Sequence, residues 1–82
     1  AYLEVNLDDI DERFNDGDVV DPTTLAENGF MKSPDDLPIV VLGRGEVGKA
    51  MTVKAQRFSG SAITKIESAG GTVDVIKTGP TE

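Results

Sequence analysis

One segment constrains the fold more than any other: the continuous apolar run Ile39-Val40-Val41-Leu42, which follows Pro38. An unbroken, mostly β-branched run of this kind is typical of a strand that is covered on both faces in a layered domain. Because 82 residues bury only about three-fifths of the surface that the unfolded chain exposes, the chain has room for one modest core. We therefore expect a single globular domain over residues 1–76, with this strand at the centre of its sheet, and a flexible tail over residues 77–82.

The segments on either side of this run alternate between strand and helix signals. In chain order we expect a short strand before residue 7, a helix over 7–14, a bridge at 19–20, a helix over 22–29, a loop over 32–37, a strand over 51–56, a helix from about 60 to 69 and a strand over 72–76. The cap candidates are Asn6, Asp21 and either Ser59 or Ser61. The alternation predicts an α/β fold, a small layered domain of short strands and helices.

The residue types that the chain lacks exclude most kinds of catalytic site. It has no cysteine and no histidine, which removes disulfides, thiolate or imidazole metal ligands and histidine proton relays. Ser59, Ser61 and Lys65 could be imagined as a serine–lysine pair, but serines before an apolar helix are usually caps. We predict neither an enzyme nor a bound metal or cofactor.

Two further observations bear on the class of protein. No apolar run approaches the roughly twenty residues that a membrane span needs. The chain starts at Ala1 without an initiator methionine or a charged-then-apolar leader, so we expect it to be part of a longer protein.

Charge is distributed unevenly along the chain. Residues 1–38 hold eleven acidic residues against Arg13 and Lys32, a net of −9, whereas residues 39–82 hold six basic residues against four acidic ones, a net of +2. The acidic residues between 8 and 21 lack the ligand spacing of a calcium loop, because counting back from Gly17 places Phe14 and Glu12 in two of the ligand positions. We interpret the first half as a solvated acidic face, and the second half as the side that could meet nucleic acid.

A glycine motif follows the central strand. Gly43-Arg44-Gly45-Glu46-Val47-Gly48 matches G-x-G-x-x-G, which in a dinucleotide-binding domain must lie between a strand and a helix. Helical spacing after the motif keeps a small nucleotide-binding domain open as an alternative function. Against it, Met51, Val53 and Ala55 also alternate as in a strand, and the chain is too short for both halves of the full fold. The glycines are better explained by a tight turn.

Several motifs in register resemble the carboxyl-terminal part of the large ribosomal subunit protein fifteen family. They are Val41-Leu42-Gly43-Arg44-Gly45-Glu46-Val47, Met51-Thr52-Val53-Lys54-Ala55, Phe58-Ser59-Gly60-Ser61-Ala62 and Ile66-Glu67-Ser68-Ala69-Gly70-Gly71. The segments around Val5-Asn6-Leu7 and from Val20 to Gly29 fit the same family. Two features differ: Val40 stands where the family commonly carries lysine, and the family's long basic amino-terminal extension is not in this chain.

The resemblance implies a superhelical α/β domain, of the ribosomal protein fifteen and eighteen-e type, that is a structural constituent of the large ribosomal subunit. It implies ribosomal RNA and neighbouring ribosomal proteins as partners, a part in subunit assembly, and no catalysis. The expected location is the cytoplasmic ribosome, with an organellar ribosome as a further possibility. A protein-interaction domain that uses the acidic half is the remaining alternative.

Two sets of residues are the candidates for function. The expected RNA contacts are the four basic residues Arg44, Lys49, Lys54 and Arg57, which could neutralise phosphates. The expected structural turns depend on glycine at positions where the backbone approaches a neighbour or bends sharply, namely Gly43, Gly45, Gly48, Gly70 and Gly71. Because no exposed aromatic pair is evident, a base-stacking platform is not expected.

Overall fold

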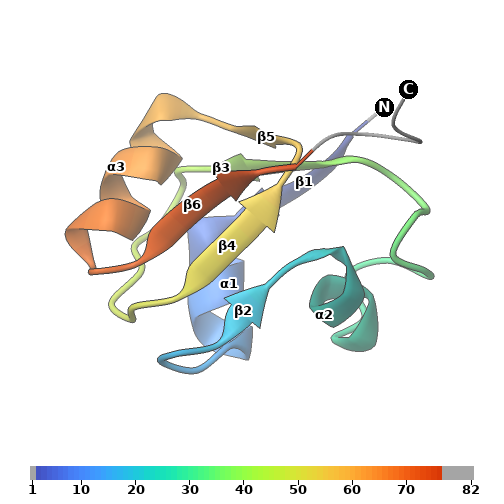
Figure 1. Ribbon diagram of the computed structural model, residues 1–82, viewed down its shortest axis with the longest axis horizontal. Helices are drawn as coiled ribbons and strands as arrows, with labels where there is room; N and C mark the ends of the chain where they lie inside the picture. The colour runs from blue at the N-terminus through green and yellow to red at the C-terminus, as the bar shows by residue number, and fades with distance from the viewer. Residues whose placement is uncertain (1, 77–82) are drawn as a thin grey trace.

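The computed structural model describes residues 2–76, and the expected tail at 77–82 lies outside this range (Figure 1). The elements are β1 (Leu3–Asn6), α1 (Leu7–Arg13), β2 (Val19–Val20), α2 (Pro22–Glu27), β3 (Ile39–Leu42), β4 (Thr52–Ala55), β5 (Arg57–Phe58), α3 (Gly60–Ser68) and β6 (Thr72–Val75). This order confirms the expected alternation of strands and helices, and with it the α/β class. None of the helices among these residues is of a length and apolarity that would span a membrane.

The strands form two parallel sheets that the chain visits in turn. The odd-numbered strands make one sheet in the order β1-β3-β5, and the even-numbered strands make the other in the order β2-β4-β6. In Figure 1, α2 and α3 lie on opposite sides of these strands. Because each successive strand joins the other sheet, the chain winds as a superhelix around the space between them, which confirms the expected arrangement.

The core is a single cluster of buried apolar side chains drawn from both sheets and all three helices. It contains Val5, Leu7, Ile10, Phe14, Val20, Leu25, Met31, Ile39, Val41, Val47, Met51, Val53, Ala55, Ala62 and Ile66. Strand β4 follows the predicted pattern, since Val53 and Ala55 are buried whereas Thr52 and Lys54 are only half-buried.

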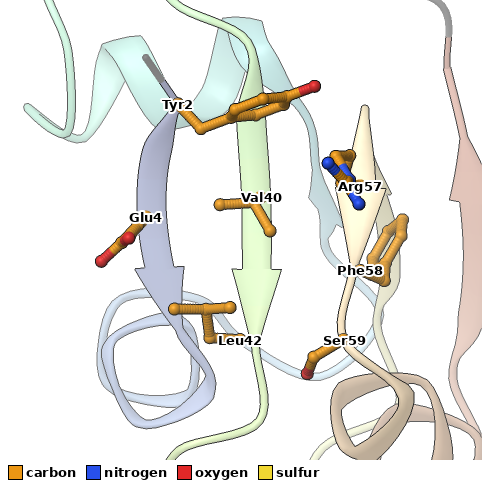
Figure 2. A pocket seen from close by; sticks show the side chains of 7 residues that line it. All are labelled: Tyr2, Glu4, Val40, Leu42, Arg57, Phe58 and Ser59. Carbon is orange, nitrogen blue, oxygen red and sulfur yellow. The ribbon is translucent and has the colours of Figure 1, made fainter.

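Strand β3 is the central strand of its sheet, as expected, but the prediction that both its faces are covered is wrong. Ile39 and Val41 are fully buried, whereas Val40 and Leu42 are only half-buried. Figure 2 shows the side chains of Val40 and Leu42 on the outer face of the β1-β3-β5 sheet, where no helix packs over them. An apolar run therefore ends on a surface that solvent reaches, and this surface is described below.

The helix caps explain where two of the helices begin. Asp21 accepts a hydrogen bond from the backbone N–H of Thr24 (2.8 Å), and the hydroxyl of Thr24 accepts one from the N–H of Asp21 (2.9 Å), which completes a capping box. Ser59 accepts from the N–H of Ala62 (3.2 Å) and is the cap of α3. Asn6 occupies the cap position of α1, but its side chain makes no capping bond, so that part of the expectation is wrong.

Candidate nucleic-acid interface

The glycine motif forms the first part of the loop over residues 43–51, which joins β3 to β4. A strand and not a helix follows it, because β4 begins at Thr52. A dinucleotide site requires a helix whose amino-terminal N–H groups face the pyrophosphate. The loop therefore lacks the structural context of that site.

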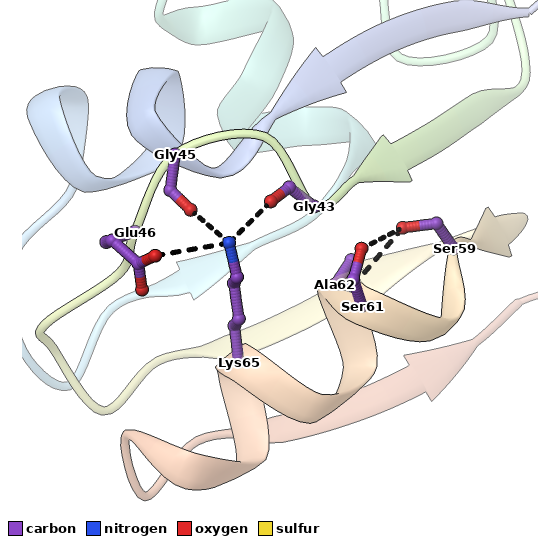
Figure 3. A network of polar contacts seen from close by, with 7 residues as sticks. All are labelled: Gly43, Gly45, Glu46, Ser59, Ser61, Ala62 and Lys65. Atoms are coloured by element: carbon purple, nitrogen blue, oxygen red, sulfur yellow. Dashed lines mark hydrogen bonds and ion pairs between the residues drawn. The ribbon is translucent and has the colours of Figure 1, made fainter.

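One face of this loop is bound by the side chain of Lys65, which reaches across from α3 (Figure 3). Its Nζ donates to the carbonyl oxygens of Gly43 (2.9 Å) and Gly45 (2.8 Å), and it lies 3.2 Å from a carboxylate oxygen of Glu46. The carbonyls of the two residues that flank Arg44 in the sequence are therefore held by one ammonium group.

The other face of the loop is bound to α1 and to the turn after it. The backbone N–H of Asp8 donates to the carbonyl of Arg44 (3.3 Å). The carboxylate of Asp11 accepts from the N–H of Gly48 (3.1 Å), and the carboxylate of Asp16 accepts from the N–H of Ala50 (2.8 Å). Two of the acidic residues that were interpreted as a solvated face therefore bind the loop through its backbone.

The ammonium group of Lys49 is also bound within the fold. It donates to the carbonyl oxygens of Asp11 and of Phe14, the latter at 2.9 Å. These carbonyls lie at the carboxyl-terminal end of α1, where a helix leaves its last carbonyls without intrahelical partners and favours a cation. Lys49 is half-buried there and stabilises the fold in this position.

The glycines of the loop and of the turn after α3 differ in what the backbone requires. Gly45 and Gly70 have positive φ angles of 86° and 88°, which other residues rarely adopt. At Gly43 a Cβ atom would overlap the side chain of Ser61, and at Gly71 it would overlap the carbonyl oxygen of Met51. At Gly48 a Cβ atom would meet nothing within 4 Å, so the geometry gives no reason for glycine there.

The four basic residues expected to contact RNA lie on three different elements. Arg44 is exposed on the loop and Lys49 is half-buried in it, as described above. Lys54 is half-buried on β4, where it pairs in register with Asp74 of β6, and Arg57 is exposed on β5. Because β4 and β5 belong to different sheets, Lys54 and Arg57 are not neighbours on one strand ladder.

The structure also shows a groove that sequence reasoning missed. It has a volume of about 420 Å³ on the outer face of the β1-β3-β5 sheet and is lined by Tyr2, Glu4, Val40, Leu42, Arg57, Phe58 and Ser59 (Figure 2). The guanidinium carbon of Arg57 lies 5.7 Å from the centre of the Tyr2 ring, which is 42% exposed. The signal that could have revealed it is the parallel register, which aligns Glu4, Val40 and Arg57 in one row across the three strands.

The imagined serine–lysine pair does not form. The hydroxyl oxygens of Ser59 and Ser61 lie 3.4 Å apart near the start of α3, whereas Lys65 is directed to the glycine loop (Figure 3). Ser59 serves as the helix cap, as expected from its position.

Comparison with known proteins follows from this geometry. Residues 4–74 match the family of ribosomal proteins that comprises 50S-L15, 50S-L18e and their counterpart in the 60S subunit. The chain belongs to this ribosomal protein family. Over 76 residues it is 45% identical to the large ribosomal subunit protein uL15 of Thermosipho africanus and 49% identical to that of Syntrophotalea carbinolica, which covers 93% of this chain and 51% of each relative. The chain thus spans about half the length of the curated relatives that it matches.

Membership of this ribosomal protein family confirms the resemblance and gives its motifs a structural meaning. The segment from Val41 to Val47 is the end of the central strand plus the loop that Lys65 and α1 hold. The segment from Ile66 to Gly71 includes the turn at which a side chain would collide with the start of β4. Val40, at the position where the resemblance leads us to expect lysine, lies on the floor of the groove and makes it apolar in this chain.

Proposed function

We propose that this chain is a structural part of the large ribosomal subunit that contacts ribosomal RNA, supports subunit assembly and has no catalytic role. The family match and the names of its relatives, both large-subunit proteins, support this proposal. Its site of action is then the ribosome, in the cytoplasm or in an organelle. The contact residues that we propose are Arg44, Lys54 and Arg57, with ribosomal RNA and neighbouring ribosomal proteins as partners.

The observation that carries the RNA contact is the way Arg44 is presented. Its side chain is exposed, while the carbonyls before and after it bind Lys65 and its own carbonyl binds the N–H of Asp8. An arginine on a fixed backbone loses less conformational freedom when it binds a phosphate than one on a mobile loop. Lysine and arginine contacts to phosphates position a protein on RNA without reading its sequence.

Lys49 differs from the other three basic residues. Since its ammonium group already binds two carbonyls of α1, we propose that it acts mainly by fixing the loop and contacts RNA little or not at all. The alternative of a nucleotide-binding domain has little support, because the backbone groups of the glycine loop are bound to Lys65 and Asp11 and no helix follows.

A competition experiment tests the contact assigned to Arg44. Wild-type and Arg44→Glu copies of the full-length protein, with distinguishable tags, are expressed together, and their ratio in purified large subunits is measured by mass spectrometry. We expect the variant to be about tenfold under-represented, because a charged hydrogen bond to phosphate contributes roughly 1.5–3 kcal/mol.

The matched control is Lys32→Glu, which reverses a charge on an exposed loop residue that has no hydrogen bond or ion pair among the described residues. This variant should enter subunits as well as the wild type does. Equal incorporation of Arg44→Glu and the wild type would contradict the proposed contact.

A further inference from the structure

We propose that the groove on the outer face of the β1-β3-β5 sheet binds one unstacked base of RNA, a base that carries an exocyclic amino group. This inference rests on the proposed function and adds a base contact to the phosphate contacts described above. It starts from the arrangement of side chains in Figure 2, where an apolar floor lies between two opposite charges.

The floor and ends of the groove suit a flat aromatic ligand. Val40 and Leu42 of the central strand form the floor. The half-exposed ring of Tyr2 and the guanidinium of Arg57 lie together at one end, and Ser59 lies at the other. Unstacked bases in RNA–protein complexes rest on aromatic rings, arginine planes and apolar side chains, because every base has two apolar faces.

The walls of the groove suit the edges of a base. The register places Glu4 on β1 and Arg57 on β5, one on each side of Val40. Their Cα atoms are separated by two strand spacings, roughly 10 Å. A carboxylate accepts from an exocyclic amino group, whereas a guanidinium donates to ring nitrogens and carbonyl oxygens. Adenine, cytosine and guanine offer both kinds of group, whereas uracil has no amino group for Glu4.

The size of the face argues against a folded protein as the main occupant. The three strands contain four, four and two residues, so the face covers on the order of 200 Å². A stable protein interface buries about 800 Å² on each partner. A volume of about 420 Å³ between two fixed charges is better matched to a single ring with polar edges.

Chemical probing of ribosomal RNA in intact large subunits tests this proposal. Subunits are purified from cells in which Glu4→Ala or Arg57→Ala replaces the wild-type full-length protein, and their bases are modified with dimethyl sulfate, which reads adenine and cytosine, and with kethoxal, which reads guanine. Both residues are exposed and Glu4 makes no side-chain hydrogen bond or ion pair among residues 2–76, so the variants should fold. We expect the same single adenine, cytosine or guanine to become roughly tenfold more reactive in both variants.

Matched controls remove the same charges away from the groove. Glu67→Ala on α3 and Lys32→Ala on the loop before β3 should leave that nucleotide protected. If Glu4→Ala and Arg57→Ala subunits contain normal amounts of the protein but no base changes its reactivity, the groove proposal is wrong and the proposed function stands. If the variants instead expose a segment of a neighbouring protein to labelling, the groove is a protein-docking site and the proposal is also wrong. If the wild-type protein is absent from large subunits, the proposed function itself fails.

Discussion

Replacing Gly71 with alanine should lower the free energy of unfolding by about 3 kcal/mol, the upper end of the usual cost of overpacking a well-packed site. The added Cβ would overlap the carbonyl oxygen of Met51 and press on Ile66, whose Cγ2 would be 3.0 Å away. That carbonyl cannot move freely, because it accepts the hydrogen bond from Thr72 (3.0 Å) that starts the pairing of β4 with β6. Urea denaturation of the purified chain measures this change, and the melting temperature should fall by roughly 12–24 °C.

Gly48→Ala is the matched control for this substitution. Its Cβ would meet nothing within 4 Å, and Gly48 is not among the glycines with a positive φ angle. The free energy of unfolding should therefore change by no more than about 0.5 kcal/mol. If alanine were tolerated equally at positions 48 and 71, the close contact between the end of α3 and the start of β4 would not exist in solution.

Replacing Lys65 with methionine should lower the free energy of unfolding by about 2 kcal/mol, because hydrogen bonds from a charged donor contribute roughly 1.5–3 kcal/mol. Methionine keeps most of the length and apolar surface of the lysine stem, so the loss reflects the bonds to Gly43 and Gly45 and not a cavity. The side chain of Lys65 is 31% exposed, and water will partly replace those bonds, which keeps the cost at the lower part of the range. The same urea denaturation measures it.

Glu46→Gln distinguishes the carbonyl bonds from the ion pair. The side chain of Glu46 is 83% exposed, and exposed ion pairs contribute little. This variant should change the free energy of unfolding by less than about 0.5 kcal/mol. A loss as large as that of Lys65→Met would mean that the ion pair, and not the pair of carbonyls, holds the loop. In that case added salt should weaken the fold as well.

Much of the fold could be predicted because local signals and tertiary structure agree. Asp21, Pro22 and Gly29 each occupy the position in or beside α2 that their backbone chemistry favours, a cap, a first helical residue and a left-handed terminus. The alternation of Met51, Val53 and Ala55 marks a strand with one buried face, and the structure has that strand. These features depend on neighbours close in the sequence, so one sequence suffices to see them.

The rest depended on contacts between distant segments. Sequence patterns could not show that Lys65 on α3 and Asp11 on α1 bind opposite sides of one loop, because their partners are backbone atoms, which every residue has. Lys49 was expected to contact RNA because a lysine beside glycines looks free until the end of α1 is placed next to it. The half-covered outer face of β3 was missed for a similar reason, since an apolar run does not reveal whether a layer covers it.

The loop over residues 43–51 connects these findings. It carries the most specific part of the family resemblance, it is bound by α1 on one side and α3 on the other, and it presents Arg44 to solvent. Its glycine motif therefore has a structural explanation that needs no nucleotide. The acidic first half of the chain contributes to the same loop through Asp11 and Asp16, so part of its charge serves the fold.

The central claim is that this chain acts as part of the large ribosomal subunit. The most direct test is co-sedimentation of the tagged full-length protein with large subunits in a sucrose gradient at moderate salt, followed by repetition at higher salt. The account predicts migration with the large subunit and release as the salt concentration rises, because phosphate contacts weaken with ionic strength. A protein that stays at the top of the gradient, in extracts where other large-subunit proteins sediment normally, would contradict it.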